Sequence, residues 1–362
     1  MSDRAALKSA FLAAHGLGDA TRVALAGDAS TRSYERLTLA DGRSLIFMDQ
    51  PPAAEAAPCP PNATPDQRRA AGYNAMARLA AGSVDAFVAC AAWLKSQGLS
   101  APAIVAADAA QGLAVLEDLG DGLYAALIAD GADEGELYDV AIDALVALHH
   151  ADPPAVLEGG GSAWPLLKYD DLALATAHDL FIDWWDKLIP SLAFSDTARA
   201  DWEALWAPIR ARGEAGASVF CHRDYHAENL VWLPQRQGAA RVGLLDFQDA
   251  VLAHPVWDLS MLLHDARRDV SPALEAASLE RYLAARPDLD GPQFRSDYAA
   301  LGALNIVRIL GVFARLTVRD GKPRYAALTP RMWRYLDALL ARPDLAPLKA
   351  WMDRHAPEWS RL

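Results

Sequence analysis

The sequence predicts an α+β protein with two lobes: a β-rich N-terminal lobe over residues 1–119 and a mainly helical C-terminal lobe over residues 120–362. Short apolar runs separated by turn residues, which are typical of antiparallel strands, recur in the first third of the chain. Long segments with apolar residues at helical spacing fill most of the remainder. The chain has 362 residues, more than one ordinary hydrophobic core accommodates.

In the first lobe, an amphipathic helix is expected at residues 4–15 and a second helix at 84–98. The apolar runs predict strands at residues 23–26, 34–39, 44–48, 103–107 and 113–116. The turn at 27–33 is rich in small and hydroxyl side chains, and such a turn can present backbone N–H groups to phosphate. Ser30, Thr31 and Arg32 are therefore candidate phosphate-binding residues, although an ordinary solvated turn has the same composition. Residues 51–65 are rich in Pro and Ala and predict a linker.

In the second lobe, amphipathic periodicity predicts long helices, and the pattern after residue 249 is helical throughout. The predicted helices are 137–150, 171–189, 198–212, 256–265, 272–285, 293–318 and 330–341. A segment at residues 116–121, punctuated by Gly120, is where a connection between the two lobes is expected, and a strand end followed by a helix cap is the alternative.

The stretch from residue 219 to 247 contains the residues that predict the chemistry. Two short strands at 230–233 and 242–245 form a hairpin, which brings Asn229 and Asp246 together at one end, and Asp224 lies in the loop before it. Phosphoryl transfer from a metal nucleotide needs such a set: one carboxylate as base, and oxygen ligands for Mg²⁺. We therefore expect Asp224 as the catalytic base, Asn229 and Asp246 as magnesium ligands, and ATP and Mg²⁺ as cofactors. The alternative is that Asp224 is an ordinary turn residue and Asp246 an ordinary strand-end residue.

Composition excludes several classes of partner. The net charge of −13 argues against nucleic acid and anionic membrane surfaces. Three cysteines without metal-ligand spacing indicate neither a disulfide framework nor a zinc site. We find no apolar run of about 18 residues and no signal-peptide core. The expectations are a cytoplasmic protein with a small-molecule substrate, no membrane association and no obligate protein partner.

The spacing H-x-D-x4-N, followed by a strand-terminal Asp-Phe, is typical of protein-kinase-like enzymes. HRDYHAEN together with LLDFQDAVLAHPVWDLSMLLHDARRDV resembles the aminoglycoside phosphotransferase/choline kinase superfamily. Segments between residues 27 and 336, among them GDASTRSYERL, LIFMDQPP and LFIDWW, resemble its bacterial anomeric sugar kinases. The resemblance implies a protein-kinase-like fold with ATP in the cleft between lobes. It also implies transfer of the γ-phosphoryl group to the anomeric hydroxyl of N-acetylmuramate or N-acetylglucosamine, giving a sugar 1-phosphate for peptidoglycan recycling.

Further residue roles follow from this resemblance. Asp258, with His222 of the HRD motif, resembles the buried brace of the catalytic loop, and a helix N-terminal carboxylate would explain Asp258 equally well. Glu117 and Leu119 resemble the residues whose backbone meets adenine. Met48 stands where related enzymes have a phosphate-binding lysine, so Arg32 is the favoured cation in its place.

The sugar should meet polar and aromatic side chains, and the lactyl carboxylate of N-acetylmuramate should attract an arginine. His226 and Glu228 flank the base within the catalytic loop. Asp183 and Trp184 share one helix, for which core packing is the more common explanation. Arg308 and Arg315 share a helix face, for which a solvated face is the alternative.

Two other functions are compatible with these patterns. The same fold could phosphorylate an aminoglycoside, choline or homoserine, and a cationic substrate of this kind would need acids or an aromatic cage. A pseudokinase is supported by the missing strand lysine and opposed by the intact Asp224, Asn229 and Asp246. A metal hydrolase built on His222 and Asp246 lacks a second histidine at ligand spacing.

Overall fold

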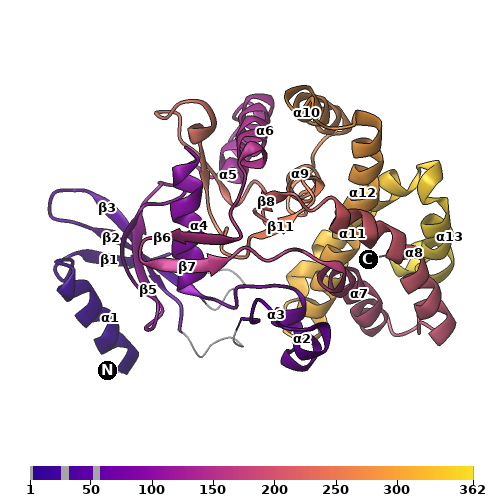
Figure 1. Ribbon diagram of the computed structural model, residues 1–362, viewed down its shortest axis with the longest axis horizontal. Helices are drawn as coiled ribbons and strands as arrows, with labels where there is room; N and C mark the ends of the chain where they lie inside the picture. The colour runs from indigo at the N-terminus through magenta and orange to yellow at the C-terminus, as the bar shows by residue number, and fades with distance from the viewer. Residues whose placement is uncertain (1–2, 26–31, 52–57, 362) are drawn as a thin grey trace. The chain divides into compact units, whose positions relative to one another are not determined.

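The computed structural model describes residues 3–25, 32–51 and 58–361 (Figure 1). The chain forms two compact units, each built from several segments. The first comprises Met1–Asp133, Ala151–Leu167 and Glu228–Ala250, and the second comprises Glu134–His150, Lys168–Ala227 and Val251–Leu362. Each unit is described by itself.

The first unit contains a five-stranded antiparallel sheet in the order β1-β2-β3-β5-β4. Its strands are β1 (Thr21–Ala24), β2 (Ser33–Thr38), β3 (Ser44–Asp49), β4 (Ile104–Asp108) and β5 (Leu113–Glu117). Phe47 of β3 pairs with Val115 of β5, and Ile46 pairs with Leu116. Because side chains alternate along a strand, these two pairs lie on opposite faces of the sheet.

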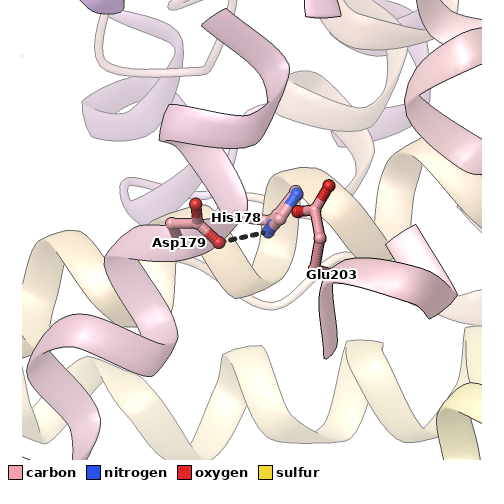
Figure 2. A group of neighbouring side chains, drawn as sticks. All are labelled: His178, Asp179 and Glu203. Carbon is pink, nitrogen blue, oxygen red and sulfur yellow. Dashed lines mark ion pairs between the residues drawn. The ribbon is translucent and has the colours of Figure 1, made fainter. Parts of the chain in front are cut away.

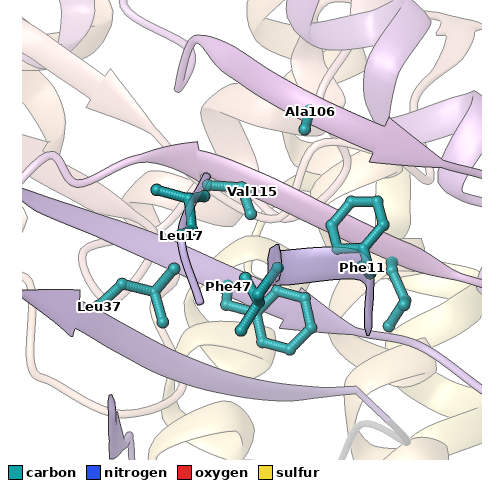
Figure 3. Packing of buried hydrophobic residues seen from close by; sticks show 8 residues of the cluster. Phe11, Leu17, Leu37, Phe47, Ala106 and Val115 are labelled. Carbon is teal, nitrogen blue, oxygen red and sulfur yellow. The ribbon is translucent and has the colours of Figure 1, made fainter. Parts of the chain in front are cut away.

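One face of this sheet packs on α1 (Asp3–Ala14), and the buried cluster is shown in Figure 3. Phe11 of α1 lies over Phe47, with ring centroids 6.1 Å apart, and Leu37 and Val115 complete the layer. Lys8 of the same helix pairs with Glu35 of β2 at 2.6 Å. Burial of this face leaves the side of Ile46 and Leu116 available for a ligand.

The first unit contains further helices and strands beside this sheet and α1. They are α2 (Pro65–Ala71), α3 (Tyr73–Met76), α4 (Val84–Ser96), α5 (Tyr124–Ala129), β6 (Val156–Gly159), β7 (Ser162–Pro165), β9 (Leu230–Trp232) and β10 (Val242–Leu244). Helix α4 contacts β4 and the β6–β7 hairpin. Strands β9 and β10 pair antiparallel, with Leu230 opposite Leu244. Asn229 directly precedes the first strand of this hairpin, and Asp246 lies two residues after its second strand.

The second unit is mainly helical. Its helices are α6 (Glu134–His150), α7 (Asp171–Leu188), α8 (Asp196–Ala215), α9 (Val256–Leu263), α10 (Pro272–Ala285), α11 (Gly291–Val318), α12 (Thr329–Leu340) and α13 (Ala346–His355). A short antiparallel pair, β8 (Val219–Cys221) with β11 (Val251–Ala253), positions the segment that begins at His222. Helix α11 lies at the centre and packs on α7, α9 and α12.

Helix α11 is the one helix, within the described residues, that is long and apolar enough to cross a membrane. Its most apolar window is 78% buried inside the protein, as is usual for the core helix of a folded domain.

Gly311 allows α11 to approach α7, because a Cβ at this position would overlap the backbone of Leu180 and Phe181. We expect Gly311→Ala to lower the free energy of unfolding by at least about 2 kcal/mol, since overpacking exceeds the gain in helix propensity. Urea unfolding followed by circular dichroism measures the change. Gly291→Ala, on the same helix with nothing within 4 Å of its Cβ, is the control and should change stability by under about 0.5 kcal/mol. Equal stability of the two variants would contradict the packing argument.

Helices α7 and α8 are joined by a polar cluster in which His178 is buried and Glu203 is exposed (Figure 2). His178, Asp179 and Glu203 offer donor atoms within 4.8 Å of one another, as a metal site would. However, Arg210 donates to Glu203 at 2.6 Å and contacts His178 Nε2 at 3.0 Å, while Trp202 donates to His178 Nδ1 at 2.9 Å. The guanidinium supplies the positive charge here, so the cluster is an ion-pair network between two helices.

The structure confirms the strands and helices that the sequence predicts, with boundaries that shift by a few residues. The prediction of helix throughout residues after 249 was wrong at residues 251–253, because these pair with β8 as strand β11. Of the predicted linker at 51–65, residues 52–57 lie outside the described residues. Its end carries a Thr64 capping box that starts α2.

Candidate active site

The first unit contains a cavity of about 440 Å³, within the range of small-molecule sites. Its apolar lining includes Ile46 and Leu116 from the sheet, and Val231 and Leu245 from the β9–β10 hairpin. Leu245 N donates to Asn229 O at 2.9 Å, which extends the hairpin by one residue. Aliphatic side chains from these two sources suit a flat aromatic group such as a nucleotide base.

Cationic and acidic side chains meet in the lining of this cavity. Arg32 Nη2 donates to Asp246 Oδ1 at 2.5 Å, and Arg32 Nη1 donates to Gln248 Oε1 at 2.8 Å. Gln248 Nε2 in turn donates to Asp246 Oδ1 at 3.1 Å. Burial opposes the charge of Arg32, yet the electrostatic effects of Tyr34 and Asp246 raise its pKa, so it stays a cation. Asp246 itself has a φ of 62°, a left-handed conformation that redirects the chain as β10 ends.

The predicted adenine-contacting residues, Glu117 and Leu119, both line this cavity. Glu117 accepts from Ala103 N at 3.0 Å and pairs with Arg236 at 2.5 Å, which holds the end of β5. Nearby, Arg36 forms ion pairs with Asp118 and Asp121, at 2.7 Å to each. These contacts fix the segment after β5 while its backbone borders the cavity.

The structure differs from the expectation at the sheet. Met48 is buried in β3 but is not among the residues lining the cavity, whereas Ile46, two residues earlier on the same face, is. Arg32 lines the cavity beside Asp246, as a substitute for the strand lysine would need to. Ser30 and Thr31 lie outside the described residues. Phosphate contact by any of these residues stays a prediction.

The residues present are suited to Mg²⁺. Asn229 and Asp246 both line the cavity and supply a carboxamide and a carboxylate, the oxygen donors that this hard cation prefers. Asp246 keeps 38% of its side chain exposed, and its Oδ1 already accepts from Arg32 and Gln248. The donor chemistry therefore fits the predicted ligand pair.

In the second unit, Asp258 of α9 braces the segment that carries Asp224. The Asp258 carboxylate is fully buried and accepts from the backbone N–H of His222 at 2.7 Å and of Arg223 at 2.8 Å. His149 Nε2, at the end of α6, lies 3.5 Å from the same carboxylate. Burial would raise the pKa of Asp258, but His149 and His222 hold it below its ordinary value. Asp224 N lies 3.3 Å from His222 Nδ1, so the loop is fixed at its base.

A smaller cavity of about 110 Å³ in the second unit holds Asp224. Its polar lining also includes His226, Asp265, Arg267 and Arg308, and its apolar lining includes Ile309, Val312 and Phe313. Arg267 Nη1 lies 3.3 Å from His226 Nε2. The cavity thus combines a carboxylate suited to a base with two guanidinium groups.

The remaining predicted sugar-binding residues lie elsewhere. Glu228 is exposed in the first unit and lines neither cavity. On α7, Asp183 pairs with Arg199 at 3.2 Å and Trp184 lies under Lys187, while neither residue lines these cavities. Arg315 is two turns beyond Arg308 on α11 and is likewise not in the lining.

Sequence reasoning missed several residues of this region. Gln248 joins Arg32 to Asp246, and His149 contacts Asp258. Tyr225 anchors the segment that carries Asp224 by donating to Ala141 O at 2.7 Å. The position of Gln248 two residues after Asp246 was a usable signal. His149 and Asp258 are far apart in the sequence, so no local pattern around His149 indicated their contact.

Comparison with known proteins supports this description. The chain is 67% identical over 360 residues to an N-acetylmuramate/N-acetylglucosamine kinase of Caulobacter vibrioides, covering 99% of both chains. It is 30% identical over 345 residues to a Pseudomonas aeruginosa protein of the same name, covering 92% of this chain and 89% of the relative. Plasmodium vivax ethanolamine kinase matches with a TM-score of 0.55 and 11% identity, covering 90% of this chain and 84% of that one. This structural likeness confirms the protein-kinase-like fold class.

Residues 21–295 match the model of the phosphotransferase enzyme family. The match spans most of the chain and includes Asp224, Asn229 and Asp246. Together with the full-length relatives, it shows that this chain is an enzyme of the phosphotransferase family.

Proposed function

We propose that this enzyme transfers the γ-phosphoryl group of ATP to the anomeric hydroxyl of N-acetylmuramate and N-acetylglucosamine, giving sugar 1-phosphates for cell-wall recycling. The observation that carries the proposal is the 67% identity, over 99% of both chains, to a kinase named for these two sugars. The cavity chemistry agrees, because Asp224 shares its cavity with two arginines. The cavity offers Arg267 and Arg308 to an anionic sugar, while its two acids, Asp224 and Asp265, balance their charge.

In the proposed mechanism, Asp224 orients the anomeric hydroxyl and accepts its proton as the oxygen attacks phosphorus in line. Arg32 contributes positive charge where the phosphates would lie. The apolar side chains that line the larger cavity would contact the adenine of ATP. Asn229 and Asp246 would hold Mg²⁺, which supplies charge neutralisation on the phosphate oxygens when bound. The chain's own contribution is positioning and electrostatics.

The proposal also includes a cytoplasmic location, where ATP is present. The three cysteines are free and buried, which is usual for proteins of that reducing compartment.

The decisive experiment is coupled ATP turnover with Mg²⁺ against N-acetylmuramate, N-acetylglucosamine, glucose, choline and kanamycin. ³¹P NMR would locate the phosphate in the product. We expect a 1-phosphate from the two N-acetylated sugars alone. Turnover only with choline or kanamycin would refute the proposed acceptor and retain the phosphotransferase chemistry.

Asp246→Asn tests the metal site. Because the variant replaces a carboxylate ligand by a neutral one, we expect the Mg²⁺ concentration for half-maximal turnover to rise at least about tenfold. Affinity for metal-free nucleotide, measured by fluorescence titration, should fall little and serves as the internal control. An unchanged Mg²⁺ requirement would remove Asp246 from the ligand set.

A further inference from the structure

We propose that Arg308 binds the lactyl carboxylate of N-acetylmuramate, and that this contact discriminates between the two sugar substrates. The inference rests on the proposed function. N-acetylmuramate differs from N-acetylglucosamine by a lactyl ether, which adds one carboxylate and one methyl group. A residue that recognises this group should be a cation, should border the cavity of Asp224 and should have apolar neighbours.

Arg308 meets the requirement for a cation that borders this cavity. It lines the cavity of Asp224, and among the residues that the structure describes no carboxylate forms an ion pair with it. Other arginines of this unit are already neutralised: Arg268 by Glu134, and Arg331 by Asp269 at 2.9 Å. A half-buried guanidinium without an acidic partner is costly, and an anionic ligand would offset that cost.

Arg308 is also held in a defined orientation. Its Nε donates to Asn305 Oδ1 at 3.0 Å, and Asn305 is fully buried. Its Nη2 lies 3.4 Å from Met261 Sδ, and the guanidinium lies 5.5 Å from the ring centroid of Trp257. With Nε bonded to Asn305 and one N–H of Nη2 directed at Met261, Nη1 and the second N–H of Nη2 can meet a carboxylate in the bidentate arrangement that arginine favours. Because the side chain is already ordered, little conformational entropy is lost on binding.

The shape and polarity of the cavity fit this assignment. Its volume of about 110 Å³ is below that of a whole ligand site, so it suits one part of a hexose. The next residues along α11, Ile309, Val312 and Phe313, provide an apolar wall for the lactyl methyl group. The other acid of the cavity, Asp265, accepts from the backbone of Arg267 at 2.8 Å and of Ala227 at 3.4 Å. The lactyl ether is two ring carbons from the anomeric carbon, so one sugar can present both groups to one cavity.

The test compares the effect of replacing Arg308 on substrates with and without the lactyl carboxylate, in the manner of a double-mutant cycle. Wild type and Arg308→Met are assayed on N-acetylmuramate, its neutral methyl ester and N-acetylglucosamine. For N-acetylmuramate we expect kcat/KM to fall at least about tenfold in the variant, mainly through KM, because a charge-assisted hydrogen bond is lost. The methyl ester and N-acetylglucosamine should change far less. Arg308→Lys should recover part of the loss, because it restores the charge without the fork.

Arg295→Met is the matched control. Arg295 is on the same helix but pairs with Glu280 at 2.6 Å on the surface, so its removal should affect no sugar selectively. An equal loss of kcat on all three sugars in Arg308→Met would overturn the proposal, since Arg308 would then face the phosphoryl group or support the fold. Unchanged selectivity would overturn it as well.

Calorimetric binding separates this inference from the proposed function. If wild type phosphorylates neither sugar, the proposed function fails, and the affinity of each protein for N-acetylmuramate and for its methyl ester still reports on Arg308. Tighter binding of the acid by wild type, lost in Arg308→Met, supports the carboxylate contact. Equal binding of acid and ester by wild type refutes it.

Discussion

Replacing Asp224 with asparagine is expected to lower kcat for sugar phosphorylation by about 10²–10⁴-fold, the usual contribution of a general base. Asparagine has nearly the same shape but cannot accept the proton of the attacking hydroxyl. Nucleotide affinity should stay close to that of wild type, because Asp224 is not in the lining of the cavity formed by the first unit. Steady-state turnover gives kcat, and titration with a fluorescent nucleotide gives the affinity.

The control is Asp66→Asn, which makes the same chemical change at an exposed ion pair with Arg69, outside both cavities. Its turnover should equal that of wild type. Full activity of Asp224→Asn would remove Asp224 from the mechanism. Loss of nucleotide binding together with turnover would instead indicate that the substitution disturbs the fold.

Asp258→Ala is expected to lower the free energy of unfolding by about 3–5 kcal/mol. The carboxylate accepts two buried backbone N–H groups, from His222 and Arg223, and alanine would leave both without an acceptor. The segment before Asp224 would then lose its anchor, so kcat should fall even at temperatures where the variant is folded. Denaturant unfolding measures the stability change. Asp66→Ala, at an exposed ion pair with Arg69, should cost under about 1 kcal/mol.

The same cluster predicts how stability depends on pH. Burial holds the pKa of His149 below its ordinary value, and the Asp258 pKa is also lowered. For both groups the unfolded chain binds protons more readily, so the stability they contribute is lost as pH falls. The loss should begin below about pH 6.5 with the histidine and increase below about pH 4 with the carboxyl. In Asp258→Ala the second part of this loss should be smaller, because other carboxyls with lowered pKa values, such as Asp297 and Glu275, still contribute. If the variant lost as much stability as wild type below about pH 4, Asp258 would not contribute to this pH dependence.

The sequence by itself determined the chemistry. Asn229 and Asp246 flank two short strands joined by a turn, and a hairpin necessarily brings its ends together. The position of Asp224 just before that hairpin, and the helical and strand periodicities, likewise follow from local spacing. For this reason the fold class, the hairpin and most elements could be predicted without coordinates. Strand β11 could not, because three apolar residues become a strand only when β8 is beside them.

Tertiary structure decided which distant residues complete each site. Arg32 meets Asp246 across 214 positions of sequence, and His149 reaches Asp258 from another helix. Among the sugar-binding candidates, Arg308 and Arg315 have equivalent spacing on one helix, yet only Arg308 lines the cavity of Asp224. Periodicity gives the face of a helix but not what packs along its length. The contacts of Arg308 with Asn305, Met261 and Trp257 therefore set it apart from Arg315, two turns away, as the proposed carboxylate-binding arginine.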